Sequence, residues 1–217
     1  MKKTALIVAG GTGSRFKSST PKQFFEFNGI PILMITLQKF SFVNEIILVL
    51  PKSHLSTWEK LCAIHSFNLN HKVVPGGNSR FKSVRRGLNE IDKESIVAIH
   101  DGVRPNVSIK LIKKLYENYS SGHAAIPIIK SKDSLISSQN GTTNYLDRDN
   151  TSKVQTPQVF NRIEIKTIYQ KHDFTNFTDD ASAFISKGGK LITIEGEESN
   201  IKITTKYDLK LLNLYLQ

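Results

Sequence analysis

Short apolar runs alternate with helix-periodic segments along most of this chain, and that alternation constrains the fold more than any other feature. The apolar runs have the length and the β-branched content of buried strands, beginning with residues 5–9. Between them, segments such as residues 81–91 place apolar side chains three and four positions apart, which is typical of one helical face. The pattern predicts an α/β fold with a mainly parallel sheet covered on both faces.

Each segment can be assigned an expected element from its periodicity. Pro31 fits the first turn of a helix and Pro51 ends a strand. No repeat or long linker divides the chain, so one domain is expected over residues 1–217. The expected strands span residues 5–9, 45–50, 71–74, 96–100, 124–129, 191–194 and 201–203, and the expected helices span residues 31–42, 57–67, 81–91, 108–119, 164–171, 180–187 and a final segment to residue 216.

The regular pattern breaks between residues 130 and 152, where polar residues surround short apolar pairs. Within this stretch Asn140-Gly141 is a strong signal for a two-residue hairpin turn. The stretch is too short to form a domain of its own. It is expected to protrude from the main domain as a polar β-arm.

The charge and composition of the chain narrow its possible partners. Thirty lysines and arginines against nineteen aspartates and glutamates give a net charge of +11, which favours anionic ligands such as phosphorylated small molecules. A basic module that binds nucleic acid is the weaker alternative, because aromatic and basic residues do not interleave. No apolar run approaches the ~18 residues that span a bilayer, so we expect a cytoplasmic protein without membrane contact. The single cysteine excludes an internal disulfide and a cysteine-based zinc site.

A glycine-rich segment, Ala9-Gly10-Gly11-Thr12-Gly13, follows the first expected strand. Glycines let backbone N–H groups turn toward an anion, so this segment is a candidate phosphate cradle. It lacks the Gly-Lys-Ser/Thr of a P-loop and the third small residue of a dinucleotide fingerprint. A glycine turn alone could equally be structural.

Two cations close behind this segment favour a functional interpretation. Arg15 offers a bidentate fork and Lys22 a point charge, a combination suited to a polyphosphate. Either residue alone would most simply be a solvated surface charge. Because both follow a strand-to-glycine turn, we interpret them as phosphate ligands.

A second candidate constellation contains Asp101, just past the expected strand at residues 96–100. Ligands of open parallel sheets gather at the carboxyl ends of the strands. A carboxylate among phosphates needs a cation beside it, so Asp101 is a candidate Mg²⁺ ligand, with a helix-capping role as the alternative. His100 is interpreted as structural.

Three further features have a structural and a functional interpretation. Gly76-Gly77 couples a glycine turn to an expected helix start. Asp179 and Asp180 could cap a helix or face a ligand. Lys202 interrupts an apolar run, as an outward residue of a strand would, or as a ligand-binding cation would.

Together these motifs resemble the 2-C-methyl-D-erythritol 4-phosphate cytidylyltransferase family of the non-mevalonate isoprenoid pathway. The likeness covers residues 5–216, and the order and spacing of the motifs are more specific than any one motif. The segments that carry it are Ala9-Gly10-Gly11-Thr12-Gly13-Ser14-Arg15, Pro21-Lys22-Gln23-Phe24, Gly76-Gly77-x-x-Arg80-x-x-Ser83-Val84, His100-Asp101-x-x-Arg104-Pro105, Asp147-Arg148, Gln155-Thr156-Pro157-Gln158-x-Phe160 and Asn200-Ile201-Lys202-Ile203-Thr204.

The resemblance implies a Rossmann-like nucleotidyltransferase domain that forms a homodimer through the β-arm at about residues 130–152. It implies transfer of a cytidylyl group from CTP to methylerythritol phosphate, with Mg²⁺ and with release of pyrophosphate. The implied catalytic residues are Arg15, Lys22, Arg148 and Lys202. The implied substrate-binding residues are Ala9, Gly10, Gly11, Thr12, Gly13, Gly77, Ser83, Asp101, Gly102, Arg104, Ser134 and Thr156, with Asp101 also holding Mg²⁺. Ser134 stands where the family usually has threonine, and Gly102 where alanine is common.

Two related alternatives remain open. The pentitol-phosphate cytidylyltransferases, which use ribitol 5-phosphate, share the nucleotide half, although Asp133-Ser134 and Asp147-Arg148 favour methylerythritol phosphate. A catalytically inactive dimeric scaffold is the other, and the presence of Arg15, Lys22, Asp101 and Lys202 argues against it.

Overall fold

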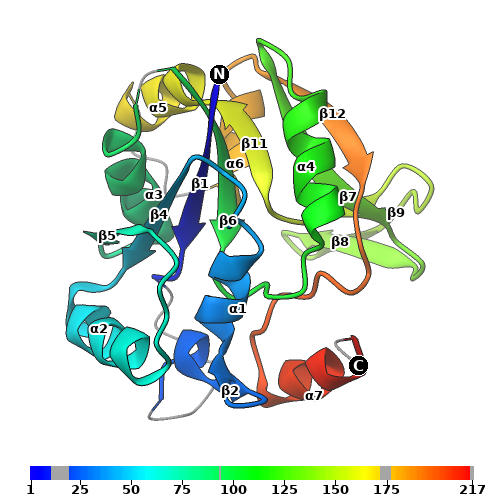
Figure 1. Cartoon of the computed structure of the whole chain (residues 1–217). Coiled ribbons are helices and arrows are strands. Elements are labelled where there is room, and N and C mark those ends of the chain that lie inside the picture. The colour runs from blue at the N-terminus through cyan, green and yellow to red at the C-terminus, as the bar shows by residue number, and fades with distance from the viewer. Residues whose placement is uncertain (11–19, 93, 172–176, 216–217) are drawn as a thin grey trace.

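The computed structural model describes residues 1–10, 20–92, 94–171 and 177–215, and within them an eight-stranded sheet lies between two layers of helices (Figure 1). The strand order is β10-β7-β11-β6-β1-β4-β5, and β12 also pairs with β7. The strands are β1 (Lys2–Val8), β4 (Glu45–Leu50), β5 (Lys72–Pro75), β6 (Ser95–Asp101), β7 (His123–Lys130), β10 (Ser152–Val154), β11 (Gln158–Asn161) and β12 (Lys190–Glu195).

The first strand lies inside the sheet, which explains why its second half, residues 5–8, is apolar throughout. It pairs in parallel with β4 on one side and β6 on the other, so neither edge is exposed. Ala5 and Ile7 pack into the cluster on one face, whereas Leu6 and Val8 pack into the cluster on the other. A strand buried on both faces has no position for a solvent-facing residue, which is the expected signature of a parallel α/β sheet.

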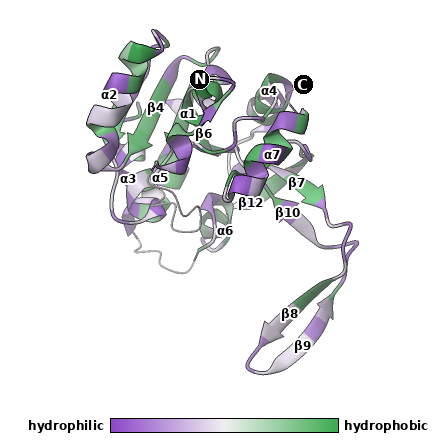
Figure 2. Cartoon of the chain, turned by 90° about the horizontal axis from the view of Figure 1, so that it is seen from below, coloured by the Kyte–Doolittle hydropathy of each residue, from purple (hydrophilic) through white to green (hydrophobic). Residues whose placement is uncertain are grey.

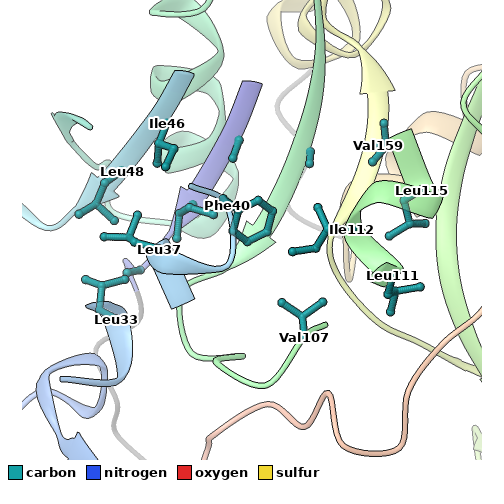
Figure 3. Close-up of a cluster of buried hydrophobic side chains, with 14 of the residues drawn as sticks. Leu33, Leu37, Phe40, Ile46, Leu48, Val107, Leu111, Ile112, Leu115 and Val159 are labelled. Atoms are coloured by element: carbon teal, nitrogen blue, oxygen red, sulfur yellow. The ribbon is translucent and has the colours of Figure 1, made fainter. Parts of the chain in front are cut away.

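The two helical layers each contribute an apolar stripe to one of these clusters. Figure 3 shows the first cluster, in which Leu33, Leu37 and Phe40 meet Ile112 and other side chains over the sheet. Each fully buried side chain of this size contributes roughly 1.5–3 kcal/mol of burial free energy. The helices on the first face are α1 (Ile32–Gln38), α2 (Leu55–Ile64) and α4 (Ile109–Asn118), and those on the second are α3 (Arg80–Asn89), α5 (Arg162–Lys171) and α6 (Asp180–Ile185). The predicted α/β fold with a mainly parallel sheet is confirmed.

The expected strand at residues 201–203 is wrong. This segment has no sheet partner; Ile203 N–H donates to the carbonyl of Val103, and Lys202 turns toward Asp101. Ile201 and Ile203 instead pack with α7 (Lys206–Tyr215) in a small third cluster. An apolar–polar–apolar triplet therefore marks a loop that is buried on one side.

The pattern also missed β10 and β11, which are short and antiparallel to their neighbours. β11 lies between β6 and β7, so an antiparallel strand interrupts the parallel order. Smaller elements near the first helix are η2 (Lys22–Phe24), the strand pair β2 (Glu26–Phe27) and β3 (Ile30–Pro31), and η3 (Lys52–His54).

The β-arm is confirmed as a two-stranded hairpin that projects away from the body (Figure 2). It consists of β8 (Leu135–Gln139) and β9 (Thr142–Leu146). Asn140 and Gly141 have φ values of 49° and 80°, as the predicted two-residue turn requires. Every residue of β9 is exposed, including Tyr145 at 82%. Because a two-stranded hairpin has no core of its own, it is at best marginally stable in water by itself.

Candidate active site

A cleft opens where the carboxyl ends of β1 and β6 meet the start of α3, and the arrowheads of both strands reach this edge of the sheet (Figure 1). Its volume is about 280 Å³. The segment directly after β1 supplies Ala9 and Gly10, the η2 turn supplies Lys22, and β6 supplies Asp101. The remaining lining residues are Val8, Gln23, Asn78, Ser79, Arg80, Val103 and Lys202.

A second pocket of about 440 Å³ adjoins the first. The two pockets share Arg80, Asp101 and Lys202, which we call the junction. The second pocket is also lined by Arg104 and Thr156 and by polar residues of the α6 start, together with Ile126, Val154, Gln155, Gln158, Ala181, Ile185 and Leu191. Ala9 and Gly10, which follow β1, thus line the first pocket and do not line the second.

Asp101 is the charged centre of the junction. Its carboxylate accepts from Lys202 Nζ at 2.9 Å, and it lies 3.4 Å from Arg104 Nε and 3.5 Å from Arg80 Nε. Burial alone would raise the pKa of this carboxyl, but the three cations outweigh burial and hold its pKa well below the usual range. Asp101 is therefore ionised at neutral pH.

A chain of hydrogen bonds fixes the backbone of Asp101. Its N–H donates to Thr156 Oγ1 at 3.1 Å, and this hydroxyl lies 3.1 Å from His100 Nδ1. The other ring nitrogen of His100 lies 3.1 Å from the carbonyl oxygen of Arg104, which can only accept, so Nε2 carries the proton. Burial lowers the pKa of His100 to about 4, which keeps the ring neutral. The structural interpretation of His100 agrees with these contacts.

The glycine turn before α3 is held by Ser83. Gly77 N–H donates to Ser83 Oγ at 3.1 Å, and Ser83 Oγ donates to the carbonyl of Ser79 at 2.9 Å. A Cβ on Gly77 would lie 2.4 Å from the Cβ of Lys82, so only glycine fits there. Ser83 is 1% exposed, so it holds the turn from the buried side. Its predicted contact with the nucleotide stays a prediction.

Gly102 also has a packing role in the structure. It is buried behind the cleft, where an added Cβ would lie 2.9 Å from both the Cβ of Ala9 and Cδ1 of Leu33. Its N–H donates to the carbonyl of Val8 at 2.9 Å. Gly102 thus lets two strand ends approach closely, and its predicted substrate contact is untested.

Gln23 attaches the turn that carries Lys22 to the cleft. Its amide nitrogen donates to the carbonyl of Ala9 at 3.2 Å and lies 3.2 Å from His54 Nδ1. The next residue, Phe24, stacks on Trp58 with ring centroids 6.3 Å apart. These contacts position Lys22 on the wall of the first pocket.

The structure does not bring all of the predicted residues together. Ser134 and Arg148 are exposed at the base of the arm, and within the described chain neither lines either pocket. Gly11, Thr12, Gly13 and Arg15 lie outside the described residues.

Arg80 is the junction residue for which the motifs predicted no role. Its two terminal nitrogens donate to the carboxylate of Asp180 at 2.9 and 2.7 Å. Burial alone would lower the pKa of this guanidinium, but the carboxylates of Asp180 and Asp101 raise it well above its usual value. The glycine-glycine-x-x-arginine motif shows that Arg80 follows a candidate functional turn. Its partner Asp180 lies 100 residues further along the chain, so no local pattern indicates the contact.

The contacts at the start of α6 show that Asp179 and Asp180 have different roles. Asp179 caps α6, because its side chain accepts from Ser182 N–H at 2.9 Å in a reciprocal capping box. Asp180 is fully buried, and it accepts from Arg80 and from the hydroxyl of Tyr169. The first aspartate is therefore structural, and the second holds a junction residue.

The described residues contain no group of three or more His, Cys, Asp or Glu side chains that could hold a metal. Asp101 is the one carboxylate that lines the first pocket in this part of the chain. A single carboxylate fits Mg²⁺ that is held mostly by substrate phosphates. Three cationic side chains already neutralise Asp101, so the need for a metal beside it is weaker than its sequence context suggested.

A parallel α/β sheet with a glycine-bearing strand end and a cation-rich double pocket defines a class of phosphate-transferring enzymes that bind a nucleotide at the sheet edge. The family model of IspD, 2-C-methyl-D-erythritol 4-phosphate cytidylyltransferase, matches residues 4–217. The chain belongs to this family, which confirms the resemblance drawn from its motifs. It is a cytidylyltransferase with a Rossmann-like fold.

Individual relatives match over nearly the whole chain. The 2-C-methyl-D-erythritol 4-phosphate cytidylyltransferase of Bacteroides fragilis is 40% identical, with 100% of both chains covered. The protein of the same name from Porphyromonas gingivalis strain ATCC 33277 is 40% identical, over 99% of this chain and 98% of its own. The crystal structure of 4-diphosphocytidyl-2C-methyl-D-erythritol synthase from Anaerococcus prevotii superposes with a TM-score of 0.85 at 32% identity, covering 100% of this chain and 98% of that one.

No described helix is long and apolar enough to cross a membrane.

Proposed function

We propose that this protein transfers a cytidylyl group from CTP to 2-C-methyl-D-erythritol 4-phosphate and releases pyrophosphate, as a step of non-mevalonate isoprenoid precursor synthesis. The observation that carries the proposal is the pair of adjoining pockets with Arg80, Asp101 and Lys202 at their junction. A reaction between two phosphorylated substrates needs two pockets that meet at a cation-rich point. Membership of the family supplies the identity of the substrates.

The bond changes follow from the substrates. A phosphate oxygen of the acceptor attacks the α-phosphorus of CTP, and the bond from that phosphorus to the bridging oxygen of the β-phosphate breaks. The electron pair leaves with pyrophosphate, and the new phosphoanhydride bond joins the cytidylyl group to the phosphate of the acceptor. The acceptor is a phosphate monoester with a second pKa near ~6, so it is largely dianionic at neutral pH and needs no general base. The protein must instead overcome the repulsion between two anions.

The first pocket is the proposed CTP site. Lys22 lies on its wall and would stabilise negative charge on the triphosphate. Ala9 and Gly10 line this pocket, and their backbone is proposed to support the phosphates. Gly11, Thr12, Gly13 and Arg15 are proposed to complete the cradle. Gly77, Ser83 and Gly102 are proposed to shape the nucleoside end.

The second pocket is the proposed acceptor site. Arg104 and Thr156 line it, and Lys202 reaches it from the junction. Arg104 is anchored by Nη1 donating to the carbonyl of Asn200 at 2.8 Å, so its charge is fixed before a substrate binds. These groups would hold the acceptor phosphate close to the α-phosphorus, and positioning of this kind supplies much of the rate in phosphoryl-type transfers.

Mg²⁺ is proposed to enter with CTP as part of the substrate. It would neutralise charge on the triphosphate, and Asp101 is the described side chain that could ligate it from the first pocket. The dependence on Mg²⁺ can be tested by chelation followed by titration with the metal.

A homodimer in the cytoplasm is also proposed, with each arm reaching the acceptor pocket of the partner. The arm exposes Ile136 at 57% and Tyr145 at 82%, and it carries Ser134 and Arg148 outside the pockets of its own chain. Contact with a second copy would bury these apolar side chains and could bring the two polar ones to a site.

The decisive experiment measures pyrophosphate release with CTP and Mg²⁺ and compares methylerythritol phosphate with ribitol 5-phosphate. Turnover with methylerythritol phosphate, and at most slow turnover with ribitol phosphate, is expected. Preferential turnover of ribitol phosphate would instead place the protein with the pentitol-phosphate enzymes. Lys22→Ala should lower kcat strongly at an unchanged melting temperature, and near-normal turnover of this variant would contradict the role of Lys22.

A further inference from the structure

The junction holds Arg80 in a position that neither the sequence motifs nor the charge at Asp101 explains. Arg80 lines both pockets, together with Asp101 and Lys202. Its side chain is 31% exposed, whereas its anchor Asp180 is fully buried. Arg80 is therefore held at its tip by the protein interior while part of it remains open to the cleft.

The hydrogen-bonding capacity of the guanidinium is only partly used by these carboxylates. Arginine carries five N–H donors in a rigid plane. One donor of each terminal nitrogen is taken by Asp180, at 2.9 and 2.7 Å, and the Nε donor lies toward Asp101 at 3.5 Å. These three contacts do not involve the second N–H group of each terminal nitrogen. Those two N–H groups suit the oxygens of a phosphate group.

The anchor of Arg80 is itself fixed from a third helix. The hydroxyl of Tyr169 on α5 donates to Asp180, and the ring of Tyr169 stacks on Phe81 with centroids 4.7 Å apart. Asp180 also begins α6, whose start is fixed by the capping box of Asp179. Three helices thus lock the guanidinium, and a donor that needs no reorganisation during reaction stabilises developing charge most effectively.

We propose that Arg80 is a further catalytic residue, which donates hydrogen bonds to the phosphate transferred between the two pockets, with Asp180 and Tyr169 as its positioning residues. This inference rests on the proposed function. As the acceptor oxygen approaches the α-phosphorus, charge is spread over the equatorial oxygens of that phosphate. A fixed guanidinium at the junction lies where this charge develops. Arg80 then complements Lys22 and Lys202, which line the same cleft.

The rival explanation is that Arg80 only joins α3 to α6. The two explanations differ in what they predict for a variant that keeps the charge. Arg80→Lys retains a cation near Asp180 but loses the fork. A purely structural role predicts a lower melting temperature with little change in kcat. The catalytic role predicts a kcat about 10²–10³-fold lower, with the KM for CTP within a few-fold of wild type.

Two further variants separate catalysis from folding. Arg80→Ala should regain part of its activity when guanidinium is added well below denaturing concentrations, because the free ion can occupy the vacated place. Tyr169→Phe removes one hydroxyl and should lower kcat by less than about ten-fold, since Asp180 keeps its two bonds to Arg80. Arg85→Gln is the matched control on the same helix; Arg85 lies over the ring of Phe81, lines neither pocket, and should leave kcat unchanged.

The wild-type chain is assayed first with CTP and methylerythritol phosphate. Turnover by the wild type, a large kcat defect in Arg80→Lys and recovery of Arg80→Ala by guanidinium would support the proposal. Turnover by the wild type with normal kcat in Arg80→Lys would overturn the role of Arg80 and leave the proposed function intact. Absence of wild-type turnover, despite CTP binding, would overturn both.

Discussion

The junction and the β-arm both carry residues that the sequence assigned to one site, yet the chain holds them in opposite ways. At the junction, Asp101 is surrounded by three cations from three parts of the chain. Asp180 anchors Arg80, and the carbonyl of Asn200 anchors Arg104. In the arm, Ser134 and Arg148 are exposed, and the hairpin beside them packs on no core of its own. The junction is formed by residues of one chain. By contrast, we propose that the arm gains a defined place through contact with a second copy.

The difference shows how one active site can combine two kinds of order. Charges that must be present at the moment of reaction are fixed in advance by helices and a sheet, because reorganising them would cost free energy during catalysis. In the proposed dimer, groups on the arm are ordered by contact with the partner. Four experiments test this comparison.

The largest effect is expected from Lys202→Ala. Removing this cation takes away the 2.9 Å contact to Asp101 and one positive charge from both pockets, so kcat should fall by about 10²–10³-fold. Because the side chain is 39% exposed, the melting temperature should change little. Steady-state kinetics and thermal unfolding measure the two quantities. Lys72→Ala, which removes a surface ion pair with Glu90 at 2.6 Å, is the matched control, and equal kcat in the two variants would contradict a special role for the junction.

The next experiment asks whether the arm serves the partner. Arg148→Ala and Lys202→Ala are each expected to be nearly inactive, and the two proteins are mixed and allowed to exchange subunits. If Arg148 reaches across a symmetric dimer, half of the dimers are hybrids with one intact site of two, so activity should return to about a quarter of wild type. If Arg148 serves its own chain, no hybrid has an intact site, and the absence of recovery would refute the exchange of arms.

The third experiment uses pH to test the buried hydrogen bonds of His100, which support Asp101 through Thr156. The folded pKa of His100 is about 4, below the ~6.5 of an unfolded histidine, so the unfolded chain binds more protons between these values. Stability should therefore fall as pH falls from about 6.5 to about 4, by about 3 kcal/mol from this group. Denaturant unfolding at several pH values gives the slope. His100→Gln should flatten it while His123→Gln does not, and an unchanged slope in His100→Gln would show that the ring is not the source.

The smallest effect is expected in the turn of the arm. Gly141 has a φ of 80°, so Gly141→Ala should cost about 1 kcal/mol through left-handed strain. This cost should leave the melting temperature of the body unchanged and raise the dimer dissociation constant about five-fold for each arm. Sedimentation at several concentrations measures the constant. Destabilisation of the body would mean that the arm is coupled to the core.

The sequence predicted most of the body because its elements are specified locally. Residues 5–8 and 46–50 are apolar throughout, and the structure places strands there that are buried on both faces. The arm was also predictable, because Asn140-Gly141 determines its turn. By contrast, β10 and β11 are only three and four residues long, and their antiparallel pairing depends on distant strands.

The site was predictable to the same extent. Asp101 and Lys22 could be proposed because each follows a recognisable turn or strand end, and the structure places both on one cleft. That Lys202 would contact Asp101 could not be deduced, because the loop at residues 201–203 resembles a strand in its pattern. Nor could the bond of Arg80 to Asp180, since nothing near either residue specifies the other.

That bond joins two residues 100 positions apart, on the first turns of α3 and α6. During synthesis, the part of α3 that lines the first pocket is made long before the carboxylate that fixes Arg80 has left the ribosome. A chain that ended before α6 would carry the glycine turn but could neither anchor Arg80 nor place Lys202. Under the proposed function, the charge cluster makes activity conditional on a finished polypeptide, so a truncated product would have an incomplete junction.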